Sequence, residues 1–130
     1  MFKLIVFDLD KTLADLGKGM SARNTAKLRR LEKSGARIAI CSGKPTYYLC
    51  GFMRQAGLKA PILIGENGAT IQFGVDLPPS DFYVLTKDER AKRVLKKVYD
   101  DIDATFEGKM WFQPNSVCVT PFPKTQEDFD

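Results

Sequence analysis

Apolar and polar residues alternate in blocks along the first half of the chain. Short apolar runs occupy residues 4–7, 38–41 and 61–64, and in the two segments between them apolar residues recur with the period of a helix. A continuous apolar run predicts a strand buried on both faces, as in a parallel sheet covered by helices. The pattern therefore predicts strand, helix, strand, helix, strand over residues 2–64, joined by two right-handed crossovers.

Capping residues mark the ends of both predicted helices. Ser21 caps a helix that runs to about Ser34, and a second helix runs from Pro45 to about Ala56, where Gly57 ends it. The apolar side chains of each helix form one stripe, which we expect to face the core. The expected core residues are Leu28 and Leu31 from the first helix and Tyr48, Leu49, Phe52 and Met53 from the second.

The pattern changes after Ile71. Residues 77–80 resemble a linker, and residues 82–85 follow as a predicted strand. Thr86 and Glu89 form a capping box for a helix through Tyr99. Three further strands are predicted at residues 104–106, 110–113 and 116–120. The sequence thus predicts a first domain over residues 1–74 and a second, mixed helix and strand domain over residues 75–130.

Composition narrows the functional classes. The chain has 130 residues, 44% of them hydrophobic, and it contains no apolar run long enough to span a membrane. It has no signal-peptide pattern, and its three cysteines lack metal-type spacing, so we expect a cytoplasmic protein with reduced thiols. The net charge of +4 comes without a nucleic-acid-binding motif. Because the chain has no histidine, carboxylates must carry any acid-base chemistry.

Two carboxylates follow the first predicted strand directly, in the segment Asp8-Leu9-Asp10-Lys11-Thr12. Ligands of α/β proteins bind beyond the carboxyl ends of the strands. Two acids this close repel each other unless a cation or a shared proton relieves the repulsion. The segment therefore indicates a cation site or a reactive site, and the alternative is a plain turn that caps a helix.

Polar residues also follow the second and third strands. Ser42, Gly43 and Lys44 come before a helix whose first turn contains Pro45, so the Ser42 hydroxyl and the Gly43 amide indicate a phosphate site. The alternative for Ser42 is a simple helix cap. Glu66 and Asn67 follow the third strand, and Asn67-Gly68 predicts a hairpin that leads to Ile71.

The order of apolar strand, Asp8, Asp10, Thr12 and Leu13 resembles the first signature of the haloacid dehalogenase-like superfamily, most of whose members are magnesium-dependent phosphatases. The resemblance implies that Asp8 is a nucleophile that forms an aspartyl-phosphate and that Asp10 is the general acid and base. It implies Mg²⁺ at Asp8 and Asp10, backbone amides near Leu9 facing the phosphate, and Thr12 steadying the loop. Ser42 matches the family's phosphate-binding hydroxyl.

The string Glu66-Asn67-Gly68-Ala69 resembles the branch of this superfamily that carries a large cap after the third strand, and which includes sugar-phosphate phosphatases and phosphomannomutases. The resemblance implies that Glu66 and Asn67 lie beside the active site. It also implies that residues 1–74 are the amino-terminal part of an incomplete Rossmann-like core and that residues 75–130 begin an α+β cap. The expected substrate is a small phosphorylated metabolite, in particular a sugar phosphate.

Two parts of the family pattern are not found. The family has a Lys after the cap and a later acidic motif on a strand. Lys96 or Lys97 with Asp100 and Asp101 is the alternative, although a helix leads into it. The expectation is a truncated and weakly active enzyme, or else a non-catalytic phosphate- or metal-binding fragment completed by a second chain. The edge of the first strand would then be unpaired, which predicts self-association.

Overall fold

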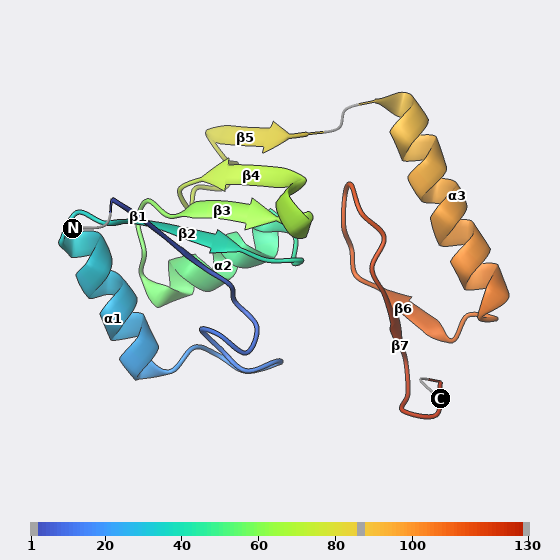
Figure 1. Cartoon of the computed structure of the whole chain (residues 1–130), viewed down its shortest axis with the longest axis horizontal. Helices are drawn as coiled ribbons and strands as arrows, with labels where there is room; N and C mark the ends of the chain where they lie inside the picture. Colours follow the sequence, from blue (N-terminus) through green and yellow to red (C-terminus); the bar gives the residue numbers. More distant parts are fainter. Residues whose placement is uncertain (1–2, 86–87, 129–130) are drawn as a thin grey trace. The chain divides into compact units, whose positions relative to one another are not determined.

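The computed structural model describes residues 3–85 and 88–128. Its main sheet has five strands in the order β1-β2-β3-β4-β5 (Figure 1). Strands β1 to β3 are parallel, and β4 and β5 continue the sheet in antiparallel orientation. The prediction of an α/β fold with a parallel Rossmann-like sheet is confirmed. The strands are β1 (Leu4–Phe7), β2 (Arg37–Cys41), β3 (Ile62–Gly65), β4 (Thr70–Phe73) and β5 (Asp81–Val84).

Two helices connect the parallel strands, close to their predicted bounds. Helix α1 (Ala22–Lys33) begins after Ser21, whose Oγ accepts a hydrogen bond from the Asn24 backbone N–H. Helix α2 (Thr46–Ala56) ends at Gly57, which has a φ of 78°. Glycine adopts this left-handed conformation without the steric cost that a side chain brings. In the part of the chain that the structure describes, no helix is long and apolar enough to cross a membrane.

The core lies on one face of the main sheet. Leu28 of α1 and Leu49 and Met53 of α2 pack with sheet residues that include Ile38, Ile40 and Leu63, and Figure 1 shows both helices on the same side of the sheet. Two crossovers of the same hand have this result, because each brings its helix back over the same face.

The opposite face of the sheet carries exposed apolar side chains. Leu4 and Val6 are 51% and 54% exposed, and the strand register places them on the same face as Phe73 of β4 and Tyr83 of β5, which are also exposed. The prediction that the first strand is buried on both faces is therefore wrong for the described chain. Tyr48, at 41% exposed, also departs from its predicted core position.

The chain divides into two compact units, Met1–Val84 and Leu85–Asp130. The first unit therefore continues past the predicted boundary at residues 74 and 75, because β5 pairs with β4. That the units are a core and a cap stays a prediction. The elements of the second unit are α3 (Glu89–Thr105), β6 (Met110–Phe112) and β7 (Pro121–Pro123).

Helix α3 is longer than predicted. Asp88 caps it by accepting a hydrogen bond from the Arg90 N–H, and Thr86 of the predicted capping box lies outside the described residues. The helix runs past Tyr99, so the strand predicted at residues 104–106 is wrong. Ion pairs one turn apart, Lys96–Asp100 and Lys97–Asp101, support the extra turns. The strand predicted at residues 116–120 is also wrong, because β6 pairs instead with β7.

Candidate active site

The loop after β1 is organised around one backbone carbonyl. The oxygen of Leu9 accepts hydrogen bonds from the N–H groups of Thr12, Leu13 and Ala14. Leu9 and Leu13 are buried and anchor the loop in the core. The loop therefore has one defined course, with the exposed Asp8 and the half-buried Asp10 on either side of the buried Leu9.

Thr12 contacts the first carboxylate of the loop. Its Oγ1 donates a hydrogen bond to Asp8 Oδ2 over 3.2 Å. A hydrogen bond to one carboxylate oxygen fixes the orientation of the group and leaves Oδ1 available for chemistry.

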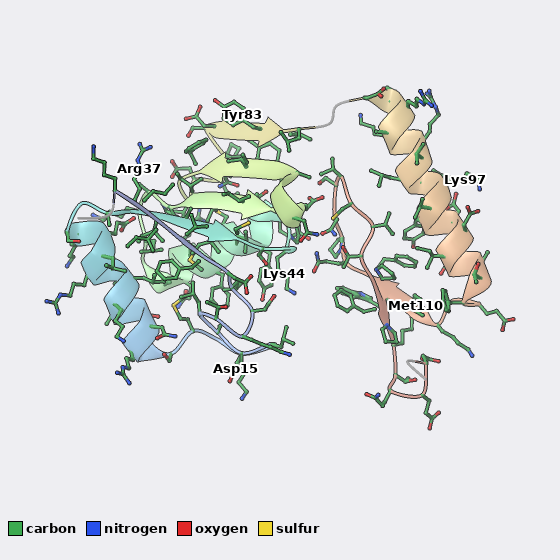
Figure 2. The ribbon with its side chains drawn as sticks, viewed as in Figure 1. Asp15, Arg37, Lys44, Tyr83, Lys97 and Met110 are labelled. Atoms are coloured by element: carbon green, nitrogen blue, oxygen red, sulfur yellow. The ribbon has the colours of Figure 1, made fainter. Side chains whose placement is uncertain are left out.

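The segment after β2 supplies a hydroxyl and a cation. Ser42 is buried, and its Oγ accepts a hydrogen bond from the Lys44 N–H over 3.2 Å. Helix α2 has Pro45 as its cap residue, so the alternative of Ser42 as the helix cap is wrong. Lys44 Nζ lies 3.1 Å from Asp10 Oδ2, and the two side chains are 22% and 28% exposed. This ion pair joins the ends of β1 and β2, and Figure 2 shows Lys44 where β2 ends.

The third segment is the predicted hairpin turn between β3 and β4. The Glu66 N–H donates to the Lys44 carbonyl, and the Asn67 N–H donates to the Ser42 carbonyl. Glu66 is buried, whereas Asn67 is exposed with its side chain beside Gly43. Both residues have positive φ angles of 52° and 57°. The turn thus supports the Ser42–Lys44 segment through the two backbone hydrogen bonds that Glu66 and Asn67 donate to it.

The structure brings all three segments together at the carboxyl ends of the parallel strands. The Lys44–Asp10 pair joins the first segment to the second, and two backbone hydrogen bonds join the second to the third. The sequence had placed Lys44 at a phosphate site but gave no signal of its pairing with Asp10, because that contact depends on the register of β1 and β2. Within this constellation, the two acidic residues Asp8 and Asp10 are separated by one residue, Leu9.

The alternative acidic motif belongs to the second unit. Lys96, Lys97, Asp100 and Asp101 form two exposed pairs along α3. Lys97 Nζ donates a hydrogen bond to the Asp101 carboxylate, and this hydrogen bond together with the negative charge of Asp101 raises the pKa of Lys97 above its ordinary value. Within residues 3–85 and 88–128, no group of three or more His, Cys, Asp or Glu side chains is arranged to hold a metal ion.

Close packing at Gly65 makes the support of the site testable. A Cβ at this position would lie 2.7 Å from the Thr46 nitrogen and 2.8 Å from the Lys44 carbonyl oxygen. We expect Gly65→Ala to lower the free energy of unfolding by about 1–3 kcal/mol, as overpacking against backbone does. Gly51→Ala is the matched control, because a Cβ at Gly51, in the middle of α2, would meet open space. This substitution is expected to raise the free energy of unfolding by up to about 1 kcal/mol. Urea unfolding measures both changes. If Gly65→Ala is as stable as the unaltered chain, the close packing at Gly65 is contradicted.

Comparison with known proteins relates this geometry to a family. Residues 5–129 match the model of a family described as haloacid dehalogenase-like hydrolase. A search of curated proteins found no match.

Solved structures show the same fold. A haloacid dehalogenase-like hydrolase from Bacteroides thetaiotaomicron is 27% identical, with a TM-score of 0.61 over 82% of this chain and 39% of its own. TM0651 from Thermotoga maritima is 18% identical, with a TM-score of 0.63 over 98% and 44%. Trehalose-6-phosphate phosphatase from Aspergillus fumigatus is 20% identical, with a TM-score of 0.56 over 97% and 48%. The chain therefore spans less than half the length of each of these structures.

Proposed function

This chain belongs to the haloacid dehalogenase-like hydrolase family, and we propose that it carries the nucleophile and phosphate site of a magnesium-dependent phosphomonoester hydrolase. The proposed substrate is a small phosphorylated metabolite, in particular a sugar phosphate. The observation that carries the proposal is the constellation at the end of β1. There Thr12 orients Asp8, while Lys44 pairs with Asp10.

Asp8 is the proposed nucleophile. Because Thr12 donates to Asp8 Oδ2, the other oxygen attacks phosphorus. The bond from phosphorus to the substrate oxygen breaks, and an aspartyl-phosphate forms. In the substrate complex Lys44 pairs with the phosphate instead, and Asp10 is protonated. Asp10 gives this proton to the departing oxygen and then takes a proton from the water that hydrolyses the aspartyl-phosphate. This second step releases inorganic phosphate and restores both carboxyl groups.

Ser42 and Lys44 form the proposed phosphate site. The Ser42 oxygen accepts from the Lys44 N–H, so its own proton stays available to donate to a phosphate oxygen. The Lys44 ammonium adds a positive charge beside Asp10. That charge reduces the repulsion between the carboxylates and an incoming phosphate. Further contacts to the substrate are proposed from the backbone amides of Gly43 and Leu9 and from the exposed Asn67 side chain.

Asp8 and Asp10 fit a weakly held magnesium ion. Magnesium takes oxygen ligands and is commonly bound through one or two carboxylates, with water and substrate phosphate filling the other positions. The Asp8 carboxylate and the Asp10 backbone carbonyl would hold the ion, which leaves the Asp10 carboxyl group available for proton transfer, and no third acidic group joins them among the described residues. When bound, the ion neutralises phosphate charge. With so few protein ligands, we expect weak magnesium binding and low turnover from the 130-residue chain by itself.

A panel of phosphorylated sugars and an aryl phosphate tests the proposal. Phosphate release that depends on both magnesium and Asp8 is the expected result. Release that continues after magnesium is chelated, at the same rate, would contradict it.

The second candidate is a phosphate- or metal-binding subunit that a further chain completes. Among the described residues, the exposed apolar side chains on one face of the sheet and the single strand partner of β1 favour it, together with the short span relative to the solved structures. The length of the reading frame, compared with the mass of the purified protein, separates the two candidates. A longer frame supports the enzyme seen in part, and a stop codon after Asp130 supports the subunit.

Either candidate predicts that the isolated chain self-associates. Strand β1 has a hydrogen-bonding partner on one side, and its Leu4 and Val6 side chains are exposed. Such an edge pairs readily with another chain. We expect sedimentation velocity to show dimers or larger species that increase with concentration, and Val6→Lys to reduce them.

Val94→Lys is the matched control, because Val94 of α3 is 55% exposed against 54% for Val6. A monomer at all concentrations, or an equal effect of both substitutions, would contradict association through the β1 edge.

A further inference from the structure

A small polar cavity adjoins the Asp8 loop and has no role in the steps above. It is lined mainly by the loop that connects β1 to α1 and has a volume of about 180 Å³. Figure 2 shows Asp15, one of its lining residues, in this loop. The other lining residues that matter here are Lys11, Thr12, Lys18, Ser21 and Asn24.

The lining of the cavity has an excess of positive charge. Lys11 and Lys18 bring two ammonium groups, and Asp15 brings one carboxylate, which lies 3.4 Å from Lys18. In the described part of the chain, ion pairs hold Lys18 and Lys44, but none holds Lys11. The cavity therefore offers one uncompensated positive charge, with the Ser21 hydroxyl as a further donor.

The cavity is connected to the proposed nucleophile through Thr12. This residue lines the cavity, and its Oγ1 holds Asp8 Oδ2. A substrate whose phosphate lies at Asp8 therefore has its remaining atoms within reach of the Lys11 side chain, three residues along the same loop. At most about 3.5 Å of extended chain separates successive residues.

Lys11 also stands at a backbone position that disfavours side chains. Its φ is 61°, and its N–H donates to the Ala14 carbonyl over 2.7 Å. Glycine adopts such a conformation most easily, whereas a lysine there is strained. Strained residues persist where the surrounding structure holds them, and they are frequent at ligand sites.

We propose that Lys11 binds a carboxylate of the substrate in this cavity, so that among small phosphorylated metabolites, sugar phosphates included, the enzyme prefers those that also carry a carboxylate. This inference rests on the proposed function, because Asp8 and Ser42 must first hold the phosphate. One uncompensated ammonium matches the single charge of a carboxylate better than a second phosphate, which carries nearly two.

Calorimetric titration with two matched compounds tests the inference. The probes are 3-phosphoglycerate and glycerol 3-phosphate, which differ in one carboxylate, in buffer that contains magnesium. We expect the unaltered chain to bind 3-phosphoglycerate more tightly, by up to about fivefold, which is the upper limit for one solvent-exposed charge pair. Lys11→Gly should abolish this preference and leave the affinity for glycerol 3-phosphate unchanged. Lys11→Arg, which keeps the charge, should retain the preference.

Folding does not confound this test, because glycine suits the left-handed backbone at position 11. Thermal unfolding of Lys11→Gly should show no loss of stability. A preference that persists in Lys11→Gly, or an equal loss of affinity for both compounds, overturns the role of Lys11 and leaves the proposed function standing. Failure of the unaltered chain to bind either compound overturns the proposed phosphate site, and the inference with it.

Discussion

Replacing Asp8 with asparagine is expected to bring aryl phosphate hydrolysis by the purified chain down to the rate in buffer alone. An amide oxygen is too poor a nucleophile to attack phosphorus, and no histidine is present to act in its place. The shape of the side chain is kept, and the amide oxygen of the substituted side chain can still accept the Thr12 hydrogen bond. The loss is therefore assigned to chemistry rather than to folding. A continuous phosphate-release assay with a coupled enzyme measures it.

The control for this substitution is Asp76→Asn, which removes an exposed carboxylate in the same unit. It is expected to keep the full rate of the unaltered chain. If Asp8→Asn keeps the rate that Asp76→Asn shows, Asp8 is not the nucleophile.

Replacing Asp10 with asparagine is expected to slow steady-state turnover by about a hundredfold or more, the range for loss of a general acid or base. The two half-reactions should respond differently. A nitrophenolate leaves without help from an acid, so Asp8 still becomes phosphorylated. Water then lacks its base, so the aspartyl-phosphate accumulates.

Rapid mixing with p-nitrophenyl phosphate shows this as a burst of nitrophenolate close to one equivalent of protein, followed by a slow phase. Asp10→Asn also frees Lys44 from its ion pair, so phosphate affinity should not fall. An equal slowing of both phases, with no burst, would assign Asp10 a role in holding phosphate or metal instead of in proton transfer.

The parallel part of the fold and the position of the site could be predicted from local patterns. Each parallel strand is a continuous apolar run, each helix has a recognisable cap, and reactive residues of such sheets follow the strand ends. Asp8, Ser42 and Asn67 could therefore be placed at one edge of the sheet before their contacts were known.

Other features depend on contacts between distant residues. The apolar run of β1 does not reveal that α1 and α2 cover the same face, so the exposure of Val6 was missed. The Lys44–Asp10 pair follows from the alignment of β1 with β2. Residues 104–106 lie at the end of α3, where ion pairs one turn earlier support the helix, although Thr105 and Phe106 by themselves favour a strand.

The most direct test of the account is to find where the phosphoryl group goes. The Asp10→Asn protein is mixed with p-nitrophenyl phosphate and magnesium, quenched in acid to preserve an acyl phosphate, digested, and mapped by mass spectrometry. The account predicts one phosphoryl group on the peptide that contains Asp8, and none when Asp8 is also replaced with asparagine. A phosphoryl group on any other residue, or full turnover with no phosphorylated protein, would contradict it.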